Sequence, residues 1–137
     1  MRKLLFITFL FLVGCSNPEG VILSEKDYIS IVDRDTSLLH LTLYKNKFYG
    51  KLTIKQPGNV IIKGDVNGKI EKDTLIGDYL YTPYKWKYQK RMPFVLLKQD
   101  ENFIEGTGIV SILLGVPHYM PRSLSFDKPK NVFLEVK

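Results

Sequence analysis

The chain has 137 residues, of which 45% are hydrophobic and 25% charged, a composition that suits one folded domain and excludes collagen-like and intrinsically disordered chains. Its formal net charge is +6, and because the lysines are scattered, this excess is typical of a solvated surface. The single cysteine excludes an intrachain disulfide, a cysteine-rich zinc site and a CxxC redox pair within this chain.

The first fourteen residues have the organisation of a secretory signal peptide. Arg2 and Lys3 supply positive charge, and the apolar run Leu4–Val13 has about half the length that a helix needs to cross a bilayer. The run ends in the letters LVGC at Cys15, which resemble the lipobox of bacterial lipoprotein precursors. This resemblance implies cleavage before Cys15 and acylation of that residue. The alternative is an ordinary secretory signal followed by a chance cysteine.

The residue after the cysteine indicates a destination. By resemblance to lipoprotein sorting in Gram-negative bacteria, Ser16 in place of an aspartate implies export to the outer membrane, with the leaflet left open. The polar and turn-forming residues that follow indicate a tether. We therefore expect the lipidated cysteine and its tether over residues 15–26, a membrane as the partner of the lipid anchor, and a single domain over residues 27–137.

Beyond residue 26 the apolar residues recur mainly at every second position, between turn residues about eight to twelve positions apart. This pattern predicts an all-β fold, a small antiparallel meander of about seven or eight strands closing into a lipocalin-like or streptavidin-like barrel. Its interior is then either filled by side chains or holds one small ligand. The residues expected to face inward are Leu39, Leu41, Leu43; Phe48, Gly50, Leu52, Ile54; Val60, Ile62, Gly64, Val66, Gly68, Ile70; and Leu75, Gly77, Tyr79 and Tyr81.

The C-terminal third is less regular. The segment Arg91–Lys98 is apolar on both faces, and Asn131–Val136 predicts a last strand. In that strand we expect three residues to face inward, namely Val132, Leu134 and Val136. The uncharged segment Ile109–Val116 does not alternate, which favours a buried strand or a short helix. The alternative is a hydrophobic flap over the barrel mouth or a second membrane contact.

A family resemblance covers roughly the middle of the chain, about residues 33–108. The run GDVNGKIEKDTLIGDY over Gly64–Tyr79, followed by Glu105-Gly106-x-Gly108, is similar to a group of small Bacteroidota lipoproteins with a lipocalin-like, β-rich fold. The resemblance implies that fold and an envelope location, and it carries no catalytic or binding residues. At Pro83–Lys90 the chain departs from the group, with aromatic residues and lysines where the group is expected to have a glycine- and serine-rich turn.

The segment Tyr79–Arg91, YLYTPYKWKYQKR, combines five tyrosine or tryptophan residues with four basic ones. In an extended hairpin arm its aromatic rings would share one face and its lysines the other. Such a face stacks on sugar rings or lies at a lipid interface, whereas the simpler reading is that the rings cover one end of the barrel. The candidate ligand-binding residues are Tyr81, Tyr84, Trp86 and Tyr88.

No pattern in the sequence indicates catalysis. His40 and His118 lack metal-ligand spacing, and no nucleophile or phosphate-loop motif occurs, so we expect no metal, no cofactor and no enzyme activity. Asp65 and Asp78 fall on predicted outer faces and do not form a glycosidase-type pair. We expect binding of a small amphipathic ligand or a glycan, and the alternative is a structural lipoprotein that docks another envelope protein. Nucleic acid is not an expected partner, because the charge is low and the compartment is wrong.

Overall fold

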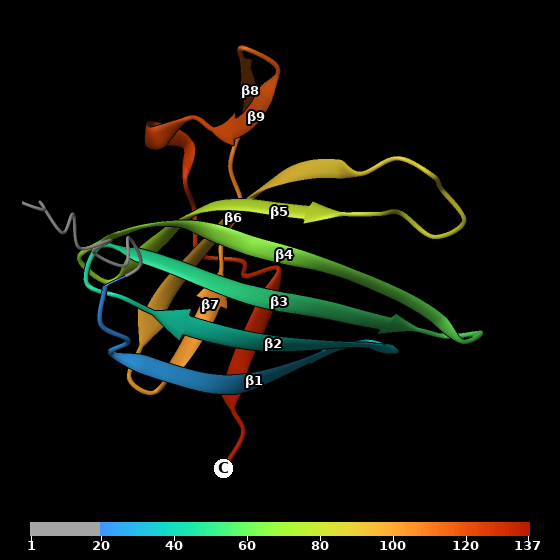
Figure 1. Ribbon diagram of the computed structural model, residues 1–137, viewed down its shortest axis with the longest axis horizontal. Helices are drawn as coiled ribbons and strands as arrows, with labels where there is room; N and C mark the ends of the chain where they lie inside the picture. The colour runs from blue at the N-terminus through green and yellow to red at the C-terminus, as the bar shows by residue number, and fades with distance from the viewer. Residues whose placement is uncertain (1–19) are drawn as a thin grey trace, which may run out of the picture.

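The structure is a computed structural model and describes residues 20–137. The predicted signal peptide and Cys15 therefore lie outside the described residues. Eight strands form a closed antiparallel barrel in the order β1-β10-β7-β6-β5-β4-β3-β2 (Figure 1), which confirms the predicted all-β meander and its closure. The barrel strands are β1 (Ser24–Val32), β2 (Asp35–Leu43), β3 (Lys47–Gln56), β4 (Val60–Glu71), β5 (Thr74–Tyr81), β6 (Lys90–Gln99), β7 (Asn102–Glu105) and β10 (Asn131–Glu135).

Between β7 and β10 the chain leaves the barrel. There β8 (Val110–Leu113) and β9 (Val116–Tyr119) pair as a separate two-stranded hairpin, and a short 3-10 turn follows over Pro121–Ser123. Within residues 20–137 the structure has no helix with the length and apolarity needed to cross a membrane.

Three of the barrel hairpins close through two-residue turns of the same geometry. The first turn residue is left-handed in each, with φ of 53° at Asp33, 57° at Lys72 and 54° at Asp100. A positive φ at this position lets the turn follow the right-handed twist of the strands that it connects. Each of these turns joins two strands that are consecutive in the sequence, so these hairpins of the meander pair neighbouring segments of the chain.

The barrel interior is filled by side chains over most of its length. Four rings, Phe48, Phe94, Phe103 and Phe133, are at most 2% exposed and come from four different strands. Tyr28 packs its ring edge-on against Phe103, with the ring centroids 5.2 Å apart. Rings of this size contribute much of the buried apolar area of a small core. The structure thus shows a packed interior along most of the axis.

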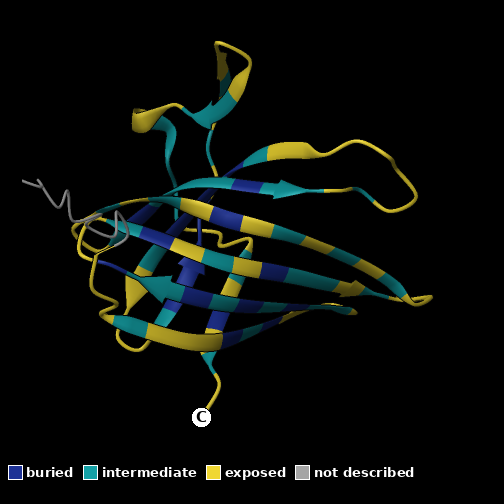
Figure 2. Cartoon of the chain, viewed as in Figure 1, coloured by how far each residue is buried: buried dark blue, intermediate teal, exposed yellow. Residues whose placement is uncertain are grey.

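The inward rows predicted for β2 to β5 are confirmed. Leu39, Leu52, Val66 and Leu75 are each at most 3% exposed, and Figure 2 shows the alternation as bands of buried and exposed residues along the strands. Where β4 and β5 pair, Gly68 lies opposite Gly77. A Cβ atom on either glycine would collide with a backbone carbonyl of the opposite strand, so both positions require glycine.

The side chains predicted to face inward from the last strand face outward instead. Val132, Leu134 and Val136 are 45 to 51% exposed, and Val136 lies beyond the end of β10, whereas Phe133 is fully buried opposite Phe103. A shift of one residue exchanges the two faces of a strand. Here the large ring occupies the interior, and the three smaller aliphatic side chains face outward.

The first strand begins inside the expected tether. Ser24, Glu25 and Lys26 pair with β2 as part of β1, so the ordered barrel starts three residues before the predicted boundary at residue 27. The pattern of β1 conceals this strand, because Tyr28 and Ser30 are buried while Ile31 is 68% exposed. In β1, the alternation of apolar residues therefore predicts the wrong face as the buried one.

The segment after β7 covers part of the barrel wall. Val95 faces away from the inward Phe94 and Leu96 yet is fully buried, because β9 packs against β6 and the Gly106 amide donates to the Val95 carbonyl at 3.1 Å. This explains why β6 is apolar on both faces, as the sequence indicated. The hairpin itself is different: Leu114 at its tip is 95% exposed, so the expectation of a buried strand or helix over Ile109–Val116 is wrong.

Candidate functional site: a pocket at the barrel mouth

The candidate site is a pocket of about 170 Å³ inside one end of the barrel. Its walls come from β3, β4, β5 and β6, and its rim from the end of β7 and the start of β10. Ligand pockets for drug-sized molecules usually measure about 300 to 1,000 Å³, so this pocket suits a smaller molecule. The lining residues are Leu52, Ile54, Ile62, Tyr79, Tyr81, Met92, Pro93, Phe94, Glu105, Lys130 and Asn131.

Two stacked tyrosines form one wall of the pocket. The rings of Tyr79 and Tyr81 lie 4.7 Å apart and are nearly parallel, at 11°. The Tyr79 hydroxyl donates to the Leu52 carbonyl at 3.4 Å, and the Tyr81 hydroxyl contacts the Met92 sulfur at 3.2 Å. Burial raises the pKa of Tyr79 to about 12, with smaller contributions from Tyr81 and Glu105. Tyr79 therefore stays uncharged at neutral pH, and the two hydroxyl contacts hold both rings in one orientation.

A buried carboxylate lies at the rim. Glu105 is only 4% exposed, and the amide nitrogen of Asn131 donates to its Oε2 atom at 2.6 Å. The Lys130 ammonium lies 3.8 Å from Oε1. Burial raises the pKa of the Glu105 carboxyl, while Lys130 and the Asn131 hydrogen bond oppose that rise.

A third residue fixes the orientation of the Asn131 amide. Ser30 Oγ donates to Asn131 Oδ1 at 3.0 Å, which leaves the amide nitrogen free to point at Glu105. Ser30, on β1, is 3% exposed, and Asn131 begins β10, so this chain of hydrogen bonds spans the closure of the barrel. The same polar network that joins the first and last strands thus holds the carboxylate of the pocket.

The pocket combines apolar and aromatic walls with a few polar groups at its rim. Among the described residues that line it, Glu105 alone carries a carboxylate, and no histidine, serine or cysteine is present to act as a base or nucleophile. Asp78 pairs with Arg91 at 3.4 Å outside the barrel. Over residues 20–137 no cluster of three or more histidine, cysteine or acidic side chains has the arrangement of a metal site. An apolar wall with one hydrogen-bond acceptor selects a ligand by shape and by one polar group.

The structure separates the four candidate residues of the sequence analysis. Tyr81 lines the pocket, whereas Tyr84, Trp86 and Tyr88 lie in the loop over residues 82–89 and are 46, 57 and 78% exposed. These three do not line the pocket. The prediction that brought them together with Tyr81 relied on an extended arm, and that arm is absent from the described loop.

The loop is built around a turn. The Trp86 amide donates to the Pro83 carbonyl at 3.0 Å, and Lys85 takes a left-handed φ of 62°. The Lys85 ammonium lies 5.3 Å from the Tyr84 ring centroid, and the Lys90 ammonium lies 4.6 Å from that of Trp86. Lys85 and Lys90 therefore lie against aromatic rings, so the predicted separation of an aromatic face from a cationic face fails at Lys85.

Sequence reasoning did not identify Glu105, Asn131 or Met92 as pocket residues. A local signal existed for Glu105, because it lies two residues after Phe103 and hence on the same, inward face of its strand. Asn131 is 26 positions further along the chain, and no local pattern links it to Glu105.

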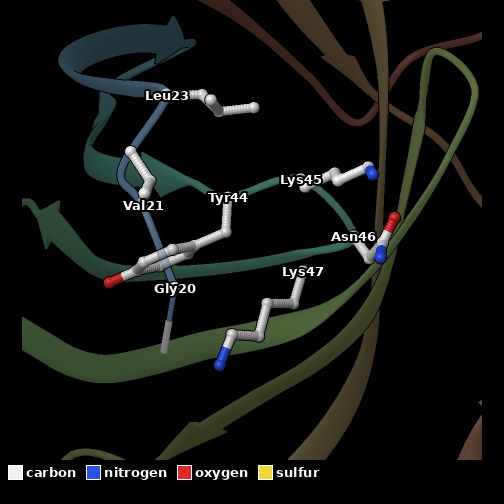
Figure 3. Close-up of a pocket in the computed structure, with 7 residues that line it drawn as sticks. All are labelled: Gly20, Val21, Leu23, Tyr44, Lys45, Asn46 and Lys47. Atoms are coloured by element: carbon white, nitrogen blue, oxygen red, sulfur yellow. The ribbon is translucent and has the colours of Figure 1, made fainter. Parts of the chain in front are cut away.

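A wider pocket of about 610 Å³ lies at the opposite end of the barrel, near the β2–β3 turn. Figure 3 shows its seven lining residues around the Tyr44 ring, from Gly20 to Lys47. It adjoins Gly20, the first described residue. The mouth pocket is walled by barrel strands and contains a buried carboxylate, which makes it the better-defined candidate.

Comparisons with models of protein families, with curated proteins and with solved structures found no match.

Proposed function

We propose that this protein is a non-catalytic binding protein of a bacterial cell envelope, held by a lipid on Cys15, that takes one small amphipathic ligand in the mouth of its barrel. The observation that carries the proposal is the buried carboxylate of Glu105 at the rim of an aromatic and apolar pocket. A buried charge is unfavourable unless it is compensated. A carboxylate kept at the edge of a cavity is well placed to accept a hydrogen bond from a bound molecule.

The pocket constrains the ligand. Its apolar part would lie against Leu52, Ile54 and the Tyr81 ring, and its donor group, such as an amine, amide or hydroxyl, would face Glu105. A volume of about 170 Å³ admits one small molecule and not a lipid chain of full length. A glycan would have to use the exposed rings of the loop over residues 82–89, outside the pocket.

The test is to recover the ligand. The protein is purified from its own host, extracted with organic solvent, and the extract is analysed by mass spectrometry. We expect one small molecule in the wild-type extract and a clear loss of it from Glu105→Gln. The matched control is Glu71→Gln, at an exposed glutamate on β4, which should retain the molecule. Equal recovery from both variants, or none from wild type, contradicts the proposal.

A second candidate is a structural lipoprotein that docks another envelope protein. Two observations favour it: the interior is filled by phenylalanine rings, and the outer face of β10 exposes Val132 and Leu134 near the 68% exposed Ile31 of β1. Crosslinking in intact envelopes distinguishes the two candidates. Docking is supported if Leu134→Lys loses a crosslinked partner that Glu105→Gln retains. Ligand binding is supported if Glu105→Gln loses the co-purified small molecule that Leu134→Lys retains.

A further inference from the structure

The hairpin formed by β8 and β9 is the most apolar exposed feature of the described chain. It projects from the barrel (Figure 1), and its turn is Leu114-Gly115. The sequence contains no acidic residue, lysine or arginine between Glu105 and Arg122. The hairpin and the residues next to it expose seven large apolar side chains, from 37 to 95% exposed: Ile109, Val110, Ile112, Leu113, Leu114, Val116 and Met120. An apolar surface of this kind on a folded protein marks a contact site.

Both faces of the hairpin expose apolar residues near its tip, which indicates the kind of partner, and the polar pair Ser111 and His118 lies further from the tip on one face. Successive residues of a strand point to opposite faces, and the neighbours Ile112 and Leu113 are 71 and 65% exposed. A protein that docks on a two-stranded sheet covers one of its faces. Hydrocarbon surrounds an inserted hairpin on both faces and at its tip, which matches the distribution seen here.

The dimensions of the hairpin limit how deeply it enters. Strands of four residues, at about 3.3 Å per residue, reach about 13 Å, which is close to one leaflet of a hydrocarbon core about 30 Å thick. A two-stranded sheet has outer edges with unpaired backbone groups, which hydrocarbon does not tolerate. The hairpin should therefore stop at the boundary of headgroups and acyl chains, about 5 to 10 Å deep.

The charges around the hairpin are those that suit anionic headgroups. Arg122 follows the hairpin directly. The loop over residues 82–89 leaves β5 at the same end of the barrel at which the chain leaves β7, because both strands run antiparallel to β6. That loop exposes Lys85, Lys87 and Trp86, and no acidic residue occurs between Asp78 and Asp100. Basic residues with tryptophan and tyrosine are typical of a bilayer interface.

We propose that the β8–β9 hairpin inserts, tip first at Leu114, into the interface of an anionic lipid bilayer, with Arg122 and the lysines of the 82–89 loop against the headgroups. The proposal is independent of the pocket and its ligand. It gives the domain a membrane contact of its own in addition to the predicted lipid on Cys15.

The experiment places a single tryptophan at the tip of the hairpin. Trp86→Phe removes the one native tryptophan, and Leu114→Trp is added to the full chain. The protein is bound to vesicles of phosphatidylcholine and phosphatidylglycerol, with and without brominated acyl chains. The control carries Leu134→Trp, at a half-exposed position on the barrel wall, in the same background. Both proteins carry the same N-terminal segment, so they differ only in the position of the single tryptophan.

We expect Leu114→Trp emission to shift to shorter wavelength and to be quenched several-fold more by brominated lipid than Leu134→Trp emission. Quenching should weaken when phosphatidylglycerol is left out, and Leu113→Glu should abolish it without changing the thermal midpoint, since Leu113 is exposed. Leu114→Trp emission that stays at the water-exposed wavelength overturns the proposal. A blue shift without quenching indicates burial of the tip against protein, as in self-association, and overturns it as well.

Discussion

The side-chain amide of Asn131 donates a 2.6 Å hydrogen bond to the buried carboxylate of Glu105 while its oxygen accepts from Ser30. Asn131→Ala leaves both buried groups without this partner, and such a loss costs about 1 to 3 kcal/mol. We expect this decrease in the free energy of unfolding, measured with urea. Asn67→Ala, at an exposed position on β4, should leave stability within about 0.5 kcal/mol. Equal effects of the two substitutions would refute the structural role of Asn131.

The pKa of Glu105 predicts a pH dependence of stability. Burial raises the pKa of this carboxyl in the folded state above the unfolded value of about 4.3. The folded protein then binds the proton more tightly, so stability is highest below the unfolded pKa and decreases as pH rises through the folded pKa.

Glu105→Gln removes this dependence. The difference in unfolding free energy between wild type and Glu105→Gln should therefore become less favourable to wild type as pH rises from about 4 to 7. Chemical denaturation of both proteins across this range measures it. A difference that stays constant with pH would show that Glu105 has the same pKa in both states.

His40 predicts a second linkage of the same sign at the surface. Its ring nitrogens lie 2.7 Å from Asp27 and 3.0 Å from Glu25, on the neighbouring strand β1, and these hydrogen bonds raise the pKa of His40. The resulting stability is fully present below about pH 6.5 and is lost as pH rises through the folded pKa. Because the group is exposed, we expect less than about 1 kcal/mol. An NMR titration should give a His40 midpoint that falls in Asp27→Asn, and an unchanged midpoint would argue against the pair.

The register of β10 can be tested by two neighbouring substitutions. Phe133→Ala removes a fully buried ring and should cost about 3 to 5 kcal/mol. Leu134→Ala, at a half-exposed position, should change stability by about 0.5 kcal/mol or less. Urea unfolding measures both. Similar losses would mean that Leu134 is packed in the core, as the alternation of the sequence indicated.

The rows of β2 to β5 could be predicted because apolar and polar residues alternate there over whole strands, as at Leu39, His40 and Leu41. The faces of β1 and β10 could not be predicted. Their aliphatic residues face outward, and the choice of Tyr28 and Phe133 as core residues depends on packing against Phe103 from a distant part of the sequence. Alternation indicates a strand, and tertiary packing decides which face is buried.

The candidate site was also hard to predict from the sequence, because tertiary structure brings its residues together. Tyr81 was identified because the aromatic segment is conspicuous, but that segment divides at Pro83, where a turn sends the later rings away from the barrel. Glu105 and Asn131 meet only because β7 and β10 are neighbours in the barrel. No local pattern could show this pairing, because it depends on closure of the whole barrel.

Native mass spectrometry of the protein purified from its own host tests whether the mouth pocket holds one small amphipathic ligand against Glu105. We expect a complex of one protein with one small molecule for wild type, and only the free protein for Glu105→Gln. A wild-type protein seen only in its free form, while stable and fully folded, would contradict the claim.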